Sequence, residues 1–376
     1  MARSDWGIYQ PVLRAIRAHD DLSLRIIVSG AHLSPEFGNT VKAIEEEFEI
    51  SDRVPSLLSS DGPGSVARAM ALGTIGMAQA FERERPDILL VLGDRFDMFA
   101  AALAALPFNI PVAHIHGGEL SEGAIDDALR HSITKLSHLH FVTTETYAAR
   151  VRQLGEEPWR VVVSGAPALD HIRALKWLTR EQIEEQFHIT LDPAPLLVTF
   201  HPVTLEFNEV EAQTRVLFDA LVDAGMPVLF TLPNADTNGR AIIDAIRRFA
   251  EEQRVPAQIV DSFGTEGYFS MMRIAAAMVG NSSSGLLEAA SFGLPVVNIG
   301  NRQRGRVRGA NVIDVGNDRK SIADAIRRAV SPQFRESIRD AANPYDAGRS
   351  AGEVIASTLA TVPLGAHLIA KRFQDQ

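Results

Sequence analysis

Cysteine is missing from the sequence of 376 residues. Its absence excludes disulfides, thiolate metal sites and cysteine nucleophiles, and it fits a reducing compartment. Long apolar runs are missing too, since none approaches the ~20 residues that a membrane-spanning helix needs. The opening residues, MARSDWGIYQP, contain no apolar core of a signal peptide. We therefore expect a cytoplasmic protein that has no membrane partner.

Positive charge is scarce. The net charge is −10 at pH 7, and no dense basic patch offsets it, although Arg302, Arg304, Arg306 and Arg308 cluster locally. Proteins that bind nucleic acid usually present such a patch, so we expect no nucleic-acid partner. The hydrophobic fraction of 46% is typical of a globular protein, and 376 residues suffice for two domains.

Short apolar runs alternate with amphipathic segments along the chain. We expect strands at Leu24–Val28, Ile88–Leu92, Pro111–His116, His140–Thr143, Val161–Ser164, Leu196–Phe200, Pro227–Leu232, Ala257–Val260, Ala276–Val279 and Pro295–Ile299. The segments with helical periodicity include Pro11–Ala18, Ser65–Glu84, Ile125–Ser137 and Glu209–Ala224. This alternation predicts an α/β fold with doubly wound parallel sheets. The strands are too many for one ordinary sheet, so we expect two Rossmann-like domains.

The domain limits follow from the same pattern. Gly165-Ala166-Pro167 ends the first alternating block, which predicts an N-terminal Rossmann-like domain over residues 1–168. A second such domain is expected over residues 169–350. The tail, residues 351–376, has a helical pattern and is expected to pack back across the domains.

One segment, GNSSSG at residues 280–285, follows an apolar strand and precedes a helix that we expect to begin at about Gly285. Backbone N–H groups and serine hydroxyls at such a turn form an anion site. An N-cap alone would need a single serine, and Ser282 and Ser283 are part of a longer polar run. Glu288 is expected on the first turn, either complementing the helix dipole or accepting ribose hydroxyls. We predict phosphate binding here.

Carboxylates follow two neighbouring strands of the first block. Asp94 stands in LLVLGDRF and Glu119 in HIHGGE, while Asp126 begins the next helix in EGAIDDALRH. Ligands bind at the carboxyl ends of strands in doubly wound sheets. Clustered carboxylates there can raise one pKa and form an acid–base set. The alternatives are a structural cap at Asp94 and i,i+4 pairing of Asp126 with Arg130. For the two histidines of HIHGGE we expect a core or supporting role rather than metal binding.

Two more candidates lie in the second block. His201 ends the strand LLVTFHPVT, where it could contact a phosphate or act as an acid. Arg306 lies in NIGNRQRGRVRG, after the strand that follows the serine-rich turn, and arginine suits diphosphate recognition. The alternatives are a structural histidine and a solvated surface loop.

Together these segments resemble the hydrolysing branch of the UDP-N-acetylglucosamine 2-epimerase family, which acts in sialic acid and related nonulosonate biosynthesis. The resemblance is carried by GDRFDMFAA, by HIHGGELSEGAIDDALRH with ITKLSHLHF, and by GNSSSGLLEAASFGLPVVNIGNRQRGR, and it spans nearly the whole chain.

The resemblance implies a GT-B architecture with a substrate cleft between two Rossmann-like domains, and a homo-oligomer, either a dimer or a tetramer. It implies a catalytic role for Asp94, Glu119, Asp126 and His201. The residues that it implies for binding UDP are Arg3, Ser282, Ser283, Gly285, Glu288 and Arg306.

The N-terminus departs from the family pattern. Family members begin with a short apolar strand before the arginine motif, and here Met1-Ala2 stands at the end of that strand. We therefore expect the first strand of the first sheet to be missing and its neighbours, around Leu24–Val28 and Ile88–Leu92, to be left without a ladder partner. A chain extended upstream by about ten residues, enough for a strand, is expected to be more stable and more active.

The chemistry expected from the resemblance is elimination of UDP from UDP-N-acetylglucosamine to a 2-acetamidoglucal, followed by hydration to N-acetylmannosamine. It needs no redox cofactor and no metal. The alternatives are the same chemistry on UDP-N,N'-diacetylbacillosamine, a non-hydrolysing 2-epimerase, a GT-B glycosyltransferase and a non-catalytic UDP-sugar-binding protein.

Overall fold

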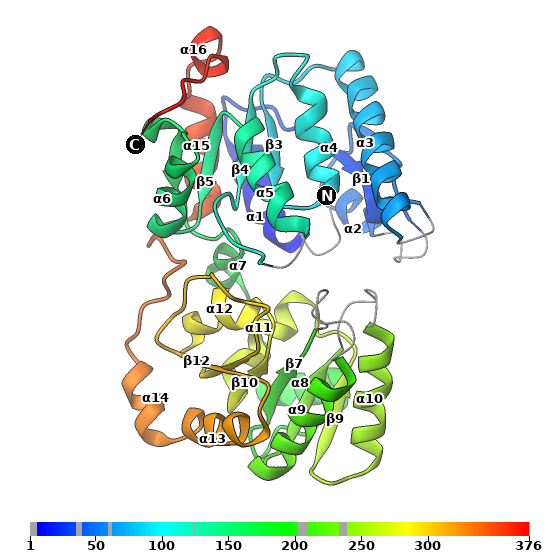
Figure 1. Ribbon diagram of the computed structural model, residues 1–376, viewed down its shortest axis with the longest axis vertical. Helices are drawn as coiled ribbons and strands as arrows, with labels where there is room; N and C mark the ends of the chain where they lie inside the picture. The colour runs from blue at the N-terminus through cyan, green and yellow to red at the C-terminus, as the bar shows by residue number, and fades with distance from the viewer. Residues whose placement is uncertain are drawn as a thin grey trace. The chain divides into compact units, whose positions relative to one another are not determined.

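A computed structural model describes residues 6–34, 40–58, 62–122, 125–201, 210–232 and 239–375. The chain divides into two compact units (Figure 1). Unit 1 consists of Met1–Glu119, Ile125–His171 and Tyr345–Gln376, and unit 2 consists of Leu120–Ala124 and Ile172–Pro344. None of the helices in the described ranges is long and apolar enough to cross a bilayer.

Unit 2 is built on a six-stranded parallel sheet in the order β12-β11-β10-β7-β8-β9. Its strands are β7 (Leu196–Thr199), β8 (Val228–Thr231), β9 (Ala257–Val260), β10 (Ala277–Gly280), β11 (Val296–Ile299) and β12 (Val312–Val315). The chain runs outward from β7 to β9 on one side and from β10 to β12 on the other. The order therefore reverses between β7 and β10, and ligands of doubly wound sheets bind at such a switch point.

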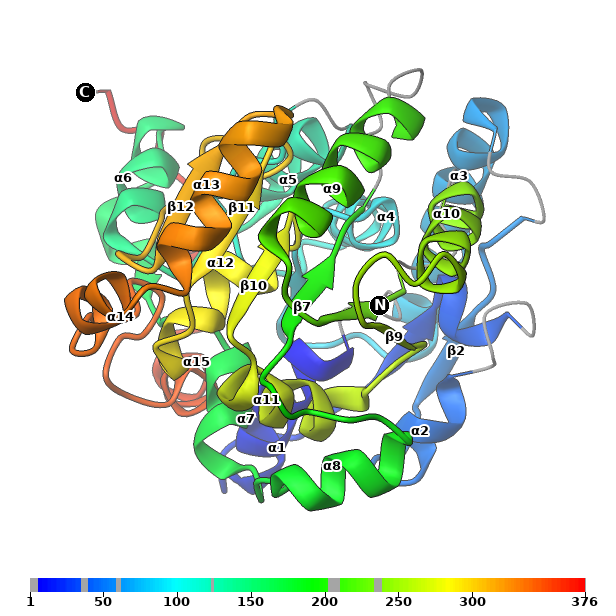
Figure 2. The same ribbon diagram turned by 90° about the horizontal axis from the view of Figure 1, so that it is seen from below.

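Helices cover both faces of this sheet because its strands are apolar on both sides. In β7, Leu196 and Val198 face one core and Leu197 faces the other. The first core is closed by α9 and α13, which lie side by side (Figure 2), and by α10. The helices of unit 2 are α8 (Arg180–Phe187), α9 (Val210–Ala224), α10 (Gly239–Glu251), α11 (Gly264–Ile274), α12 (Ser284–Leu287), α13 (Arg319–Ala329) and α14 (Pro332–Ile338).

Unit 1 contains two parallel sheets. The larger has the order β3-β4-β5-β6, and the smaller pairs β1 with β2. The strands are β1 (Ile27–Ser29), β2 (Asp52–Val54), β3 (Leu89–Leu92), β4 (Val112–Ile115), β5 (Leu139–Val142) and β6 (Val161–Val163). The sequence analysis expected β1 and β3 to lack a ladder partner on one side. In the described residues, β1 and β3 each stand at the edge of a separate sheet. The N-terminal motif with Arg3 lies outside the described residues.

The four-stranded sheet also carries helices on both faces. Its helices are α1 (Trp6–Ala18), α2 (Val41–Glu45), α3 (Pro63–Arg83), α4 (Phe96–Ala105), α5 (Ile125–Leu136), α6 (Glu145–Gln153), α7 (Ala168–Ala174), α15 (Ala351–Thr361) and α16 (Ala366–Ile369). One core joins the strands to α1, α2 and α15, and the other joins them to α3, α4 and α5. The predicted α/β class with doubly wound parallel sheets is confirmed.

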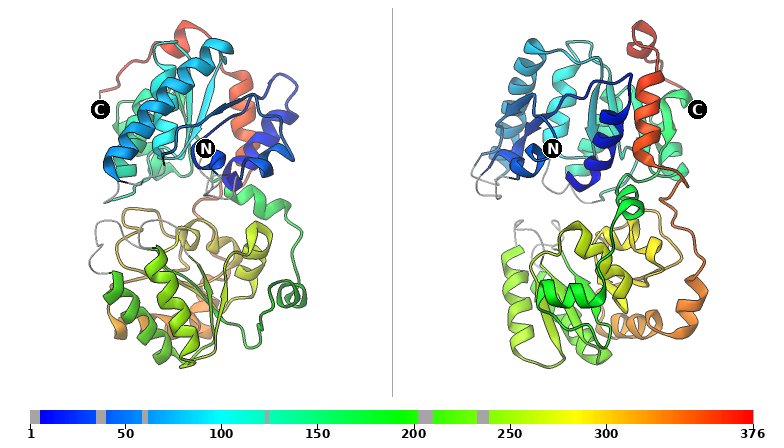
Figure 3. Two further views of the ribbon diagram at one scale, coloured as in Figure 1. Left: turned by 90° about the vertical axis from the view of Figure 1, so that its right-hand side faces the viewer. Right: turned by 180° about the vertical axis from the view of Figure 1, so that it is seen from behind.

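The C-terminal segment is part of unit 1, where α15 packs beside α1 (Figure 3). An added Cβ at Gly352 would lie 2.9 Å from Pro11 O, so the two backbones approach closely. The Asp170 carboxylate accepts the N–H groups of Ala351 at 3.0 Å and Gly352 at 2.7 Å, which satisfies two unpaired donors at the start of α15. The buried Arg160 guanidinium donates hydrogen bonds to the backbone oxygens of His367, Leu368 and Ala370, which follow α15.

Candidate active site

Carboxylates gather at the carboxyl ends of β3 and β4 in unit 1. Asp94 follows β3, Glu119 follows β4, and the buried Arg130 of α5 lies against both. Its Nη2 donates to Asp94 Oδ2, its Nη1 donates to His116 O at 2.8 Å, and its Nη1 stands 3.8 Å from Glu119 Oε2. A guanidinium with several fixed donors thus joins two of the predicted acids.

Arg130 was missed as a site residue by the sequence analysis, which named it only in an alternative, as an i,i+4 partner of Asp126. Spacing along a helix shows which side chains are neighbours, but Arg130 extends toward the strand ends instead. The equivalent pairing does form one residue along, where His131 Nε2 lies 3.6 Å from Asp127 Oδ2.

Glu119 is almost fully enclosed, with 2% of its surface exposed. Its Oε1 accepts hydrogen bonds from His116 Nδ1 at 2.6 Å and from Thr143 Oγ1 at 3.2 Å. Thr143 follows β5, so three consecutive strand ends contribute to one polar cluster, which we call the Arg130 cluster: Asp94, His116, Glu119, Asp126, Arg130 and Thr143.

Asp126 has the electrostatics of a proton donor. Burial raises the pKa of its carboxyl, and the negative charge of Asp94 raises it further, while Arg95 and Arg130 oppose the rise. A carboxyl with a raised pKa stays protonated at a higher pH than usual, which general acid catalysis requires.

His114 has a structural role, as the sequence analysis expected. It is fully buried, its Nε2 donates to Gly93 O at 2.7 Å, and its Nδ1 lies 3.3 Å from Thr134 Oγ1. Burial lowers the pKa of His114 to about 3, against the effect of the Gly93 hydrogen bond. The neutral ring fixes the turn that carries Asp94. No group of side chains among the described residues has the arrangement of a metal site.

In unit 2 the serine-rich turn lies at the switch point, directly after β10. Gly280 has φ of +138°, and an added Cβ would stand 1.9 Å from Thr199 O, so only glycine allows β10 to approach β7 here. The helix differs from the prediction, because α12 begins at Ser284 and has only four residues. Glu288 therefore ends α12 instead of lying in its first turn. A helix this short adds little dipole, so anion binding here would depend on hydroxyl and N–H groups.

Tyr268 of α11 was also missed by the sequence analysis. Burial raises the pKa of its hydroxyl to about 12. The hydroxyl also forms hydrogen bonds with Thr199, Ser282 and Ser284, and these lower the pKa. The tyrosine side chain thus links the end of β7 to the serine turn. A tyrosine within an amphipathic helix gives no sequence signal for this contact.

His201 and the arginine loop lie beside the same turn. Burial and the nearby Arg302 charge lower the pKa of His201 to about 3, so the ring is neutral at physiological pH. Asn281 O accepts from Arg302 Nη1 at 3.0 Å and from Gln303 Nε2 at 2.9 Å. Arg306 Nε donates to Leu120 O at 3.4 Å, which ties the loop to the segment after Glu119.

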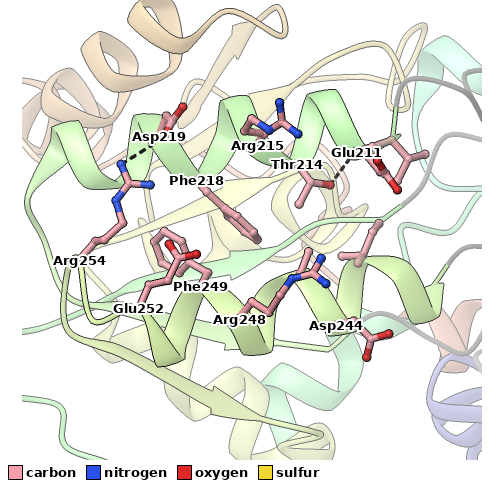
Figure 4. A pocket seen from close by; sticks show the side chains of 13 residues that line it. Glu211, Thr214, Arg215, Phe218, Asp219, Asp244, Arg248, Phe249, Glu252 and Arg254 are labelled. Atoms are coloured by element: carbon pink, nitrogen blue, oxygen red, sulfur yellow. Dashed lines mark hydrogen bonds and ion pairs between the residues drawn. The ribbon is translucent and has the colours of Figure 1, made fainter.

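A separate groove of about 540 Å³ runs between α9 and α10. Figure 4 shows it lined by alternating acidic and basic side chains, with Arg254 paired to Asp219 at 3.2 Å. It contains none of the predicted site residues, so it does not define the active site.

Two doubly wound α/β units with polar residues at the strand ends define a GT-B-like protein. The structure of the Methanocaldococcus jannaschii UDP-GlcNAc 2-epimerase in complex with UDP-GlcNAc and UDP has this fold, with a TM-score of 0.77 at 17% identity over 95% of this chain and 97% of that one.

The family model described as UDP-N-acetylglucosamine 2-epimerase matches residues 14–359, and the chain belongs to this family. The protein is thus a nucleotide-sugar 2-epimerase. A similar protein is the hydrolysing GDP/UDP-N,N'-diacetylbacillosamine 2-epimerase of Campylobacter jejuni, 40% identical over 89% of this chain and 87% of its own. The hydrolysing UDP-N,N'-diacetylbacillosamine 2-epimerase of Legionella pneumophila is 36% identical over 98% and 96%.

Proposed function

We propose that the protein is a hydrolysing 2-epimerase that converts a UDP-2-acetamido sugar into UDP and the free C2-epimeric sugar. Membership of the family is the observation that carries the proposal, and the Arg130 cluster supports it. A protein that only binds the nucleotide needs a diphosphate site, but it has no use for buried carboxyls held by an arginine.

The substrate that we place first is UDP-N,N'-diacetylbacillosamine, because relatives with 36–40% identity bear that activity in their names. UDP-N-acetylglucosamine, which the sequence analysis ranked first, remains the second candidate through the family description. The two sugars share the 2-acetamido group at the reacting carbon, so the same proton transfers serve both.

Unit 2 would hold the leaving group. The hydroxyls of Ser282 and Ser283 and the N–H groups of their turn suit the diphosphate, as does the guanidinium of Arg306. Glu288 is the candidate for binding the ribose hydroxyls. Fixed donors at the position where charge develops stabilise the transition state more than the bound substrate.

Unit 1 would move the protons. A base takes the C2 proton, the electron pair of the C2–H bond forms the C1=C2 bond, and the C1–O bond breaks as UDP leaves. Water then bonds to C1 and gives up one proton to solvent, while an acid group donates a proton to the opposite face of C2. Asp126 suits this second transfer because burial and the charge of Asp94 raise the pKa of its carboxyl, which favours the proton-donating form.

Mass spectrometry after incubation with each nucleotide sugar in heavy-oxygen water tests the proposal. Label at the anomeric carbon of a freed, C2-inverted sugar is the expected result. A C2-inverted sugar still joined to UDP would instead indicate a non-hydrolysing epimerase. Binding without any change in the sugar would indicate a UDP-sugar-binding protein.

A homo-oligomer is part of the same proposal. Apolar side chains on neighbouring helices of unit 1 are left in solvent, with Leu72 43% and Ile75 57% exposed on α3, and Leu106 50% exposed at the end of α4. Burial of such groups against a second copy would be favourable. Sedimentation of the purified protein would show a species larger than 41.0 kDa.

A further inference from the structure

The Glu119 carboxylate is already fully engaged with protein groups. Its Oε1 holds two donors, His116 Nδ1 at 2.6 Å and Thr143 Oγ1 at 3.2 Å, and its Oε2 faces Arg130 Nη1 at 3.8 Å. With a side chain only 3% exposed, it has little room to reach a sugar. It has the surroundings of a group that orients another side chain.

His116 is the side chain that it orients. The ring is 8% exposed, its Nδ1 donates to Glu119, and its Nε2 is buried with no hydrogen-bond partner among the described residues. A neutral ring that carries its proton on Nδ1 presents a bare lone pair on Nε2. Buried polar atoms are usually paired, so an unpaired one calls for an explanation.

The backbone of His116 is held in a costly conformation. Its φ is 66°, in the left-handed region that only a few per cent of residues other than glycine adopt, with asparagine, aspartate and histidine the most frequent among them. The conformation is fixed from both sides, because His116 N donates to Phe141 O at 3.0 Å and Arg130 Nη1 donates to His116 O at 2.8 Å. Such strain concentrates at functional sites.

Two other histidines of the same sheet differ from His116. Both ring nitrogens of His114 have partners, as expected of a structural residue. His140 also pairs with a glutamate, Glu156, and its Nδ1 lacks a partner among the described residues, but it lies inside β5 with no exposed surface. His116 stands beyond the carboxyl end of β4, where ligands of such sheets bind.

We infer that His116 is a catalytic base of the proposed reaction and that Glu119 is its positioning residue. The inference rests on the proposed function. The Nε2 lone pair takes the C2 proton, the C2–H electron pair forms the C1=C2 bond, and the C1–O bond electrons leave with UDP. The imidazolium that results is stabilised by the Glu119 carboxylate through Nδ1–H, and it returns its proton to solvent after the sugar leaves.

Three variants separate this role from a structural one. H116N keeps a donor toward Glu119 and tolerates the left-handed backbone, but it has no Nε2. H116Q places an amide nitrogen near the Nε2 position without a basic lone pair. The matched control is H131N, the same substitution at a partly exposed histidine of α5 that pairs with Asp127 and lies outside the Arg130 cluster.

UDP release from each of the two nucleotide sugars is measured for these variants, with thermal unfolding as the check on folding. We expect the kcat of H116N and H116Q to fall about 100-fold or more, with their KM within threefold of wild type. The kcat of H131N should stay within fivefold of wild type. More than a tenth of wild-type kcat in H116N overturns the inference, as does recovery in H116Q, which would indicate a hydrogen bond instead of proton transfer.

A measurement without turnover distinguishes failure of the inference from failure of the proposed function. In ¹⁵N NMR of the D94N variant, His116 should carry its proton on Nδ1, and its Nε2 signal should shift on adding one of the two nucleotide sugars but not UDP alone. An unshifted Nε2, or one that carries the proton in the free protein, overturns the assignment. Wild-type protein that releases no UDP while Nε2 shifts would contradict the proposed reaction and support the contact.

Discussion

Asn281 holds the main chain of His201 with both ends of its amide. Its Oδ1 accepts from His201 N at 2.7 Å, and its Nδ2 donates to His201 O at 2.8 Å. This pair joins the carboxyl ends of β7 and β10, the two strands between which the order of the unit 2 sheet reverses. One buried amide therefore fixes the position of His201 relative to the serine turn.

Replacing Asn281 by alanine should loosen this part of the site. We expect N281A to lose about 1–3 kcal/mol of unfolding free energy, because buried backbone groups lose their partners. UDP affinity, measured by calorimetry, should fall at least tenfold. N298A is the matched control, since Asn298 is equally buried on the adjacent strand and bonds Asp314. Equal UDP affinity in N281A and wild type would contradict the assignment of this turn to UDP.

Asp94 should be needed for turnover. Replacing it by asparagine removes the charge that pairs with Arg130 and is expected to raise the barrier by ~3–5 kcal/mol. Steady-state UDP release measures the effect. Asp87, exposed just before the other end of the same strand, is the control, and D87N should behave as wild type. Turnover above a tenth of wild type in D94N would remove Asp94 from the chemistry.

The carboxyl of Asp126 should titrate above the ordinary range of aspartate. Burial and the Asp94 charge both raise its pKa, so D94N should lower it. Carbon NMR of labelled carboxyl groups follows the titration in both proteins. D127N is the control, because Asp127 pairs with His131 and is not among the causes of the shift. An unchanged Asp126 pKa in D94N would show that the two groups are not coupled.

Glu156 should make the stability of unit 1 depend on acid pH. Burial disfavours its charged form, but hydrogen bonds from His140, Lys135 and Lys371 outweigh burial and lower its pKa to about 2. A lowered folded-state pKa stabilises the protein above the unfolded value of about 4.5, and this contribution is lost as the pH falls toward 2.

Urea unfolding of E156Q against wild type, at pH 6 and pH 3.5, measures that contribution. At pH 6 the variant should be less stable by about 3–5 kcal/mol, because Lys135 and Lys371 lose the buried carboxylate with which they pair, and this difference should narrow at the lower pH. E145Q is the control, since the Glu145–Arg152 pair spans 3.9 Å with Glu145 78% exposed. A gap that stays constant with pH would disprove the linkage.

Arg160 should hold the last residues of the chain. Its Nη1 donates to Leu368 O at 2.8 Å and to His138 O at 3.1 Å, and its Nη2 donates to His367 O at 3.1 Å. Lysine cannot replace this fork of donors. In R160K we expect fast amide exchange over residues 366–375 while α15 stays protected by Asp170. An exchange pattern equal to wild type would show that the guanidinium is dispensable.

The fold was largely readable because apolar strands and amphipathic helices differ in period. The strands that escaped prediction, β2 and β12, carry a charged residue within a short run and lie at sheet edges. Helix α1 was predicted from Pro11 but begins at Trp6. Proline leaves the carbonyl of Gly7 without its helical donor, and His171 supplies a hydrogen bond to that oxygen instead.

The candidate site was less readable, because strand ends show which residues come near a ligand but not where side chains turn. Asp94 and Glu119 could be grouped from topology alone. Tertiary packing decides the other contacts, and a single sequence has no periodic signal for it. These contacts are the hydrogen bond of Arg130 to Asp94, that of Thr143 to Glu119 and that between Asn281 and the main chain of His201.

Unit 1 takes its first residues and its last from opposite ends of the polypeptide. A ribosome that synthesises the chain exposes α1, with its apolar side, long before α15 leaves the exit tunnel to cover it. The hydrogen-bond partners of Asp170 and Arg160, at Ala351 and Ala370, are likewise synthesised about 180 and 210 residues later. Unit 1 can therefore close only after its C-terminal segment has been synthesised, whereas the last segment of unit 2 ends at Pro344 and is synthesised earlier.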